Sequence, residues 1–426
     1  MKTDLAQGCL EYQKLTRRRF LTTGIGAAAS VVLSSGFSGS AAAQIAGSER
    51  DTLISIFLRG GCDGLTLCVP HGEDAYYSAR PSLRIPQPGG GSSAATSLDG
   101  FFGLPPAMTP LLDAYNAGHF LFVHACGSKN DTRSHFDAQH FMEIGEPGMP
   151  LLATGWLGRH LLSVPPRQPA ALLRAIGMRA GLQTTLAGSP LALPIPDPSR
   201  FGLLGSPATK AARLEALEAL YAAASDPLYT ASANTLATIG LVESVDILGY
   251  QPSNGAEYAQ TDFGDALRSA AALIKADVGI EAFAVDAGGW DTHNGQEPLD
   301  GLMATLMDGF ARSLAAFYTD VIAGGMHNVT VVIMSEFGRK VKENGSRGTD
   351  HGHGNVMMLL GRNVAGGQVL TQWPGLQPEH LFEEQDLEVT IDYRDVLAEL
   401  ITERLGNTDL GFVFPGFTPT LRGVTA

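Results

Sequence analysis

The densest group of potential metal ligands in this sequence lies between residues 336 and 353. Glu336 is followed by Asp350, His351 and His353, in a chain that has only 11 histidines. Glycines on both sides of His353 allow the backbone to approach a ligand closely. Carboxylate and imidazole groups at such density are typical of a site for a divalent cation.

A second carboxylate and imidazole pair lies on the glycine-rich segment Asp286-Ala-Gly-Gly-Trp-Asp291-Thr-His293. This segment follows the apolar run 281–285, which predicts a strand. A turn with two glycines can direct Asp291 and His293 at one ion. A polar loop that binds nothing is the alternative interpretation.

Two further candidates are Asp63 and Ser134. Asp63 follows a Gly-Gly pair just beyond the apolar run 52–58, and Ser134 precedes His135 where a helix is expected to begin. The free amides of a helix N-terminus favour an anion, so Ser134 is a candidate nucleophile and metal ligand if a base or an ion lowers its pKa. Helix capping by either residue is the structural alternative.

Basic side chains near these candidates offer a binding site for an anionic group. Arg133, Arg339 and Arg347 stand beside the predicted ligands, and a guanidinium binds a phosphate or sulfate group through two hydrogen bonds. Oxygen ligands combined with imidazole suit Zn²⁺, Mn²⁺, Mg²⁺ or Ca²⁺. The sequence has no Cys-x-x-Cys pair, which argues against a zinc-thiolate site.

The elements that must position these residues follow from the apolar patterns. Alternating strands and helices in the later half predict an α/β fold, with a mainly parallel sheet covered by helices on both faces. The polar clusters follow predicted strands, and ligands bind at the carboxyl ends of such strands. The predicted strands are 52–58, 119–126, 281–285, 328–334 and 356–360; the predicted helices are 209–224, 263–276, 302–322 and 394–405.

The first 43 residues have the order of a secretory signal. The basic stretch Thr16-Arg17-Arg18-Arg19-Phe20-Leu21 precedes a small, apolar, uncharged run and then Ser40-Ala-Ala-Ala43. The paired arginines are typical of the twin-arginine class, which predicts a periplasmic or otherwise exported protein. A short membrane anchor is the alternative, but the run is shorter than the roughly 20 residues that a bilayer requires. Residues 44–426 are then predicted to form one domain with loop insertions.

Net charge and cysteine content restrict the partners. The formal charge of −14 opposes binding to nucleic acid and to anionic membranes, and no later segment is apolar enough to predict stable membrane insertion. Cys62, Cys68 and Cys126 allow one disulfide in an oxidising compartment, and the sequence does not select the pair.

A series of motifs in fixed order resembles the DUF1501 family of exported bacterial proteins of unknown function, over nearly the whole mature chain. That family is distantly similar to the alkaline phosphatase and sulfatase superfamily, which implies an α/β sandwich, two metal ions and a Ser, Thr or modified Cys nucleophile. The motifs are the twin arginines, Leu58-Arg-Gly-Gly-Cys-Asp-Gly-Leu65, Ser134-His-Phe136, Gly155-Trp-Leu-Gly158, Gly289-Trp-Asp-Thr-His293, Ser335-Glu-Phe-Gly-Arg339 and Gly348-Thr-Asp-His-Gly352.

The resemblance implies a role for several of these residues. The first-strand aspartate of the superfamily falls on Asp63 and its nucleophile falls on Ser134. Its Asp/His pair falls on Asp291 and His293, although the usual spacing is four residues rather than two.

The remaining superfamily ligands match less well. The Asp-His-Gly that follows a strong strand falls on Glu336-Phe337-Gly338, and a phenylalanine cannot bind a metal. The final histidine falls on His351 or His353. Either the nearby Asp350 and His351 replace the missing ligand, or one metal site is lost. The resemblance is therefore compatible with either one or two bound ions. The absence of a Cys-x-Pro-x-Arg motif argues against a formylglycine nucleophile.

Three functions follow as hypotheses. The first is an exported metal-dependent hydrolase of phosphate or sulfate esters that uses Ser134 as nucleophile and an arginine as anion clamp, with a small or polymer-borne anionic ester as substrate. The second is a metal-binding scaffold or accessory protein that keeps the fold without hydrolysis and serves an unknown partner protein. The third is an enzyme that uses the same metal site for another reaction.

Overall fold

The computed structural model describes residues 50–426, all of which fall within one compact unit. The predicted signal sequence of residues 1–43 lies outside the described residues. No helix among the described residues is long and apolar enough to cross a membrane.

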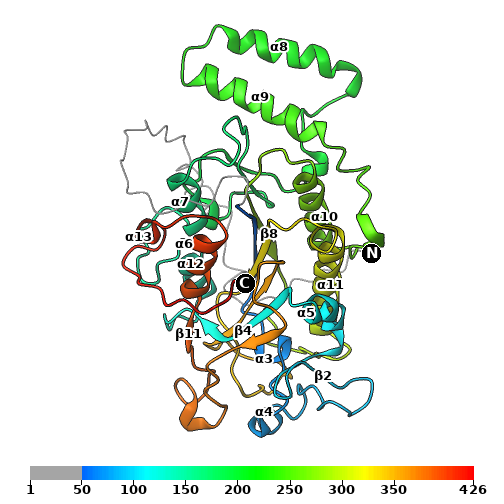
Figure 1. The fold of residues 1–426 in the computed structure, drawn as a ribbon, viewed down its shortest axis with the longest axis vertical. Helices are drawn as coiled ribbons and strands as arrows, with labels where there is room; N and C mark the ends of the chain where they lie inside the picture. Colours follow the sequence, from blue (N-terminus) through cyan, green and yellow to red (C-terminus); the bar gives the residue numbers. More distant parts are fainter. Residues whose placement is uncertain (1–49) are drawn as a thin grey trace. The chain divides into compact units, whose positions relative to one another are not determined.

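A nine-stranded, mainly parallel sheet forms the centre of the structure, as predicted (Figure 1). Its order is β10-β4-β9-β8-β1-β7-β5-β6, and β11 pairs with β4. Only β9 is antiparallel to its neighbours, β4 and β8. The strands are β1 (Thr52–Leu58), β4 (Phe120–Gly127), β5 (Ala175–Gly177), β6 (Ala192–Pro194), β7 (Ala282–Ala287), β8 (Val329–Met334), β9 (Asn355–Leu360), β10 (Gln368–Leu370) and β11 (Ile391–Asp392); β2 (Thr96–Ser97) and β3 (Gly103–Leu104) form a separate pair.

Helices cover both faces of the sheet, which confirms the predicted fold class (Figure 1). The helices are α3 (Gly64–Leu67), α4 (Asp74–Ala79), α5 (Leu112–Asn116), α6 (His135–Ile144), α7 (Trp156–Ser163), α8 (Lys210–Ala222), α9 (Leu228–Ser244), α10 (Asp262–Lys275), α11 (Leu302–Phe317), α12 (Tyr393–Glu403) and α13 (Leu410–Val413). Successive residues of a strand point to opposite faces, so Ile54 and Ile56 of β1 pack with α10 and α11, whereas Leu53 and Phe57 pack with α7 and α12.

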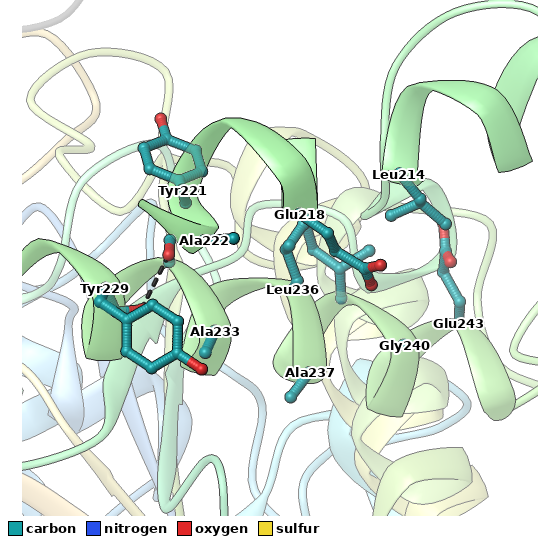
Figure 2. Close-up of a pocket in the computed structure, with 12 residues that line it drawn as sticks. Leu214, Glu218, Tyr221, Ala222, Tyr229, Ala233, Leu236, Ala237, Gly240 and Glu243 are labelled. Atoms are coloured by element: carbon teal, nitrogen blue, oxygen red, sulfur yellow. Dashed lines mark hydrogen bonds between the residues drawn. The ribbon is translucent and has the colours of Figure 1, made fainter. Parts of the chain in front are cut away.

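The helices α8 and α9 form a hairpin at the upper end of Figure 1. No residue of α8 is buried, which shows that this hairpin contributes little to the core. A groove runs between the two helices, and Figure 2 shows Leu214 and Glu218 of α8 opposite Leu236 and Ala237 of α9. The sequence predicted α8 from its alanine and leucine spacing but did not predict α9.

The three cysteines of the described chain are free and buried, so the disulfide that the sequence allowed does not form. Burial raises the pKa of the Cys62 thiol to about 12, which keeps this group protonated and unreactive.

Candidate metal centre

The candidate site is formed by the loops that follow β4, β7 and β8. These three strands run in the same direction, so their carboxyl ends meet at one edge of the sheet. The loop after β4 leads to His135, the first residue of α6. The loop after β7 contains Asp291 and His293, and the one after β8 leads through Glu336 to His351.

Three imidazoles converge on one carboxylate oxygen. The Nε2 atoms of His293, His351 and His135 lie 3.1, 3.4 and 3.5 Å from Asp291 Oδ1. The Nε2 atoms of His293 and His351 are themselves only 2.9 Å apart. Among residues 50–426, His135, Asp291 and His351 form a group whose ligand atoms all lie within 4.8 Å of one another. The chain therefore has a candidate metal site, which we call the His₃Asp cluster (His135, Asp291, His293 and His351).

Each imidazole of the cluster has its other ring nitrogen, Nδ1, next to an oxygen atom of the protein. The partners are Glu336 Oε1 for His135 at 2.8 Å, Asp350 Oδ1 for His293 at 3.2 Å, and the Arg133 carbonyl oxygen for His351 at 2.9 Å. An Nδ1–H that donates to such an oxygen leaves the Nε2 lone pair available, which is the usual support of a histidine that binds a metal.

The electrostatics of the cluster favour a positive charge. Burial alone would lower the pKa of His135, but hydrogen bonds with Asp291 and Glu336 raise it to about 9. Burial would raise the pKa of Asp291, yet hydrogen bonds from the three histidines hold it far below its usual range. For His351, burial dominates and lowers the pKa. The carboxylates of Asp291 and Glu336 thus attract a cation, and a proton on His135 supplies the positive charge when no ion is bound.

Glu336 was predicted as a metal ligand, but the structure places it behind the cluster. Its side chain is fully buried, and Oε1 accepts hydrogen bonds from Gly60 N at 2.9 Å and Gln139 Nε2 at 2.8 Å besides the contact with His135. Hydrogen bonds with His135 and Gln139 outweigh burial and lower the pKa of Glu336 to about 2. Glu336 therefore orients His135, and Asp350 orients His293 in the same way.

Asp63 lies in a separate buried network. Its carboxylate pairs with Arg80, whose side chain is fully buried, and it accepts hydrogen bonds from Thr66 Oγ1 at 2.7 Å and Gln296 Nε2 at 2.6 Å. Burial would raise the pKa of Asp63, but the charge of Arg80 lowers it. The structure thus gives Asp63 a partner that the sequence did not indicate, and it does not bring Asp63 into the His₃Asp cluster.

Arg339 was predicted to clamp a substrate anion, but all of its donors point into the protein. Its side chain is fully buried and donates to the carbonyl oxygens of Gly60, Gly61 and Thr349. It also donates to Asp291 Oδ1 at 2.7 Å. Arg339 therefore fixes the carboxylate of the cluster.

The other two candidate clamps also have acidic partners. Arg133 Nη2 lies 2.7 Å from Glu383 Oε2 and 2.6 Å from Asp386 Oδ2. Arg347 is largely exposed and lies 3.4 Å from Glu297. Arg133 would have to break its ion pairs with Glu383 and Asp386 before it could bind an anionic substrate.

Ser134 lies at the N-terminus of α6, directly before His135 of the cluster. It occupies the N-cap position, yet its hydroxyl makes no capping hydrogen bond. The side chain is half-buried, and the carbonyl of the preceding residue, Arg133, is the partner of His351. The capping role that competed with a nucleophilic one is therefore not observed.

His353 lies apart from the cluster. Its ring stacks on Phe382 at 4.2 Å between centroids, and burial lowers its pKa to about 4. Phe337 instead packs against the rings of His135 and His351, at 4.9 and 4.8 Å. Phe337 thus forms an apolar wall of the cluster.

His135 was not predicted as a metal ligand, although it lies in the Ser134-His-Phe136 motif. The signal was present, because His135 is the first residue of the helix that Ser134 was predicted to begin. No sequence signal indicated the contact of Gln139 with Glu336, because the two residues are far apart in the chain. The pairing of Arg80 with Asp63 was also not indicated, because Asp63 was predicted to bind the ion.

A family model described as "Protein of unknown function (DUF1501)" matches residues 121–412 of this sequence. No curated protein matches it. Among solved structures, the C-terminal periplasmic domain of EcEptC from Escherichia coli is 12% identical, and the match covers 90% of this chain and 91% of that chain with a TM-score of 0.36. The 2-O GAG sulfatase BT1596 is 10% identical over 88% and 76% of the two chains (TM-score 0.32). The alkaline phosphatase from the Antarctic bacterium TAB5 is 10% identical over 73% and 91% (TM-score 0.28).

Proposed function

The chain belongs to the DUF1501 family, and we propose that it is an exported, metal-dependent hydrolase of phosphate or sulfate esters. The supporting observation is the convergence of three imidazole Nε2 atoms on Asp291 Oδ1, one of them from His135, which directly follows Ser134 in the chain. A helix N-terminus next to a bound cation is a favourable place for the anionic group of an ester.

The His₃Asp cluster fits a single divalent ion. Three imidazoles and one carboxylate would be its ligands, a set that suits Zn²⁺ or Mn²⁺ better than the all-oxygen preference of Mg²⁺ or Ca²⁺. Asp63 is neutralised by Arg80 and Glu336 is saturated by hydrogen bonds, so neither is left for a second ion. We therefore propose one ion per chain rather than two.

Ser134 is the proposed nucleophile. Its oxygen forms a bond to the phosphorus or sulfur atom, the bond from that atom to the ester oxygen breaks, and the alcohol leaves with the proton that the serine hydroxyl has lost. Water then hydrolyses the serine ester and restores the hydroxyl. The ion, when bound, supplies a Lewis acid that polarises the ester and lowers the pKa of the hydroxyl. His135 and Phe337 shield the inner side of the cluster from water.

A metal-binding scaffold without hydrolysis is the second candidate. The observation in its favour is that Arg133 and Arg339, two of the three predicted anion clamps, are both engaged by acidic residues of the chain. An ester hydrolase needs positive groups that stabilise the charge of the transition state. A scaffold needs only the ion and the fold that surrounds it.

Metal analysis with and without a chelator tests the proposal. We expect about one Zn²⁺ or Mn²⁺ per purified chain, and chelation should lower both the melting temperature and the turnover of aryl phosphate or sulfate esters, because binding stabilises the native state by mass action. Readdition of the ion should restore both. Full turnover after complete removal of the ion would contradict the proposal, whereas an ion without turnover would support the scaffold.

We also propose that the protein reaches the periplasm by the twin-arginine route, on the basis of the stretch that contains Arg17 and Arg18. Replacing both with lysine keeps the charge but removes the motif, so we expect the protein to accumulate in the cytoplasm. Cell fractionation measures this, and Arg19→Lys is the matched control, which should still be exported. Export of the double variant at the normal level would show that another pathway is used.

A further inference from the structure

The side chains of the His₃Asp cluster differ in their exposure to solvent. The side chain of His135 is 1% exposed and that of His351 is 13% exposed, whereas His293 is 29% exposed. Asp350, which supports His293, is 50% exposed. His293 and its partner Asp350 therefore form the most exposed part of the cluster and its surroundings.

A cavity of about 760 Å³ lies next to this exposed part, because Asp350 lines it. Asp350 and Asn344 line it, and both also hold His293: Asp350 Oδ1 lies 3.2 Å from its Nδ1, and Asn344 Nδ2 donates to its carbonyl oxygen at 2.9 Å. Its size lies within the range of about 300–1,000 Å³ that is usual for small-molecule sites. We call it the Asp350 cavity.

The floor of the Asp350 cavity is apolar, and its rim contains both hydrogen-bond donors and acceptors. Val341 and Leu376, both buried, and Leu381 line the floor. The rim includes ammonium, hydroxyl, carboxamide and carboxylate groups: Lys340, Lys342, Ser78, Gln377, Gln385 and Glu384.

The mixture of charges indicates what kind of group fits. Two lysines and four carboxylates, those of Asp74, Glu343, Asp350 and Glu384, line the cavity, so it does not present a single sign of charge. A strongly anionic or cationic group would meet like charges there. A hydroxyl both donates and accepts, so several hydroxyls can use donors and acceptors at once while the C–H face of their carbon skeleton contacts the apolar floor.

We propose that the Asp350 cavity binds the organic part of the ester substrate, and that this part is a neutral, hydroxyl-rich group of the sugar or polyol class. This inference rests on the proposed hydrolase function for its place in the reaction, but binding to the cavity does not require turnover. The reactive anionic group then lies at the His₃Asp cluster and the sugar or polyol lies beyond Asp350.

Saturation-transfer NMR tests the binding of the organic part by itself. The probes are glucose and galactose at millimolar concentration, with glucuronate as the anionic and 4-nitrophenol as the aromatic comparison. Ser78→Trp places a large ring at the cavity rim, and Thr305→Trp makes the same kind of change at an exposed position of α11 outside the cavity. We expect saturation transfer to the neutral sugars from the wild type and from Thr305→Trp. With Ser78→Trp the saturation-transfer signal should be about tenfold weaker, at an unchanged melting temperature.

Ester turnover then separates this inference from the proposed function. If the protein hydrolyses esters, Ser78→Trp should raise the KM for glucose 6-phosphate or its sulfate about tenfold, while the kcat/KM for 4-nitrophenyl phosphate or sulfate should change less than about twofold. Sugar binding without any turnover would support the cavity and contradict the hydrolase. Equal saturation in wild type and Ser78→Trp, no saturation of neutral sugars, or a preference for glucuronate or 4-nitrophenol would overturn the inference.

Discussion

Asp291→Asn is expected to purify with less than about a tenth of the wild-type ion, because Asp291 Oδ1 is the atom on which all three imidazoles of the cluster converge. The amide keeps the size of the side chain but loses the charge that the ion needs. The same change leaves the buried Arg339 without its carboxylate, which adds a loss of about 3–5 kcal/mol in the free energy of unfolding. Elemental analysis and thermal melting measure the two effects.

Asp63→Asn is the matched comparison for this variant. It also breaks a buried ion pair, with Arg80, and should cost about 3–5 kcal/mol of stability. We expect it to retain its ion, however, because Asp63 lies outside the His₃Asp cluster. Loss of the ion in Asp63→Asn, or its retention in Asp291→Asn, would show that the ligands have been assigned incorrectly.

Ser134→Ala is expected to lower the turnover of aryl phosphate or sulfate esters by about three orders of magnitude or more, as is usual when a nucleophile is removed. The free energy of unfolding should change by less than about 0.5 kcal/mol, because the hydroxyl does not cap α6. Ion content should stay at the wild-type value. Steady-state kinetics, melting and elemental analysis are measured on the same sample.

Ser244→Ala, a change at the end of α9, is the control for Ser134→Ala and should leave all three quantities unaltered. If Ser134→Ala keeps most of the activity, the nucleophile is another group. If the wild type is fully loaded with ion and turns over neither ester class, the scaffold becomes the better account, and the internal pairing of Arg133 is a physical reason for it.

The elements that could be predicted from the sequence are those with a continuous apolar signal. The strands β1 and β8 match their predictions closely because each is buried along its whole length, which gives a run of β-branched and other apolar residues. The strands β5, β6, β10 and β11 have only two or three residues each, too few for any pattern. Likewise α9 was not predicted, because it is hardly buried and has no clear apolar face.

The location of the site could be predicted from the sequence, but the contacts between its residues could not. Placing Asp291, His293 and His351 together needed only the rule that strand ends meet at one edge of the sheet. Separating Glu336 and Asp350, which orient histidines, from the ligands themselves depends on distances of a few ångströms between loops. The pairing of Asp63 with Arg80 joins a glycine turn to the residue that follows α4, and no local pattern marks it.

The order of strands in the sheet has a consequence for how the chain must fold. The central strand β1 pairs with β7 and β8, more than two hundred residues later, and β4 joins the sheet only through β9. A nascent chain that ends before residue 282 cannot form either side of its central strand. Closing such long loops loses conformational entropy before any hydrogen bond between strands forms. The sheet is therefore expected to assemble slowly and only once synthesis is nearly complete. Until then the unpaired backbone N–H and C=O groups of the apolar strands β1 and β4 are open to pairing with other chains, and a chaperone that covers them during this interval would raise the yield of folded protein.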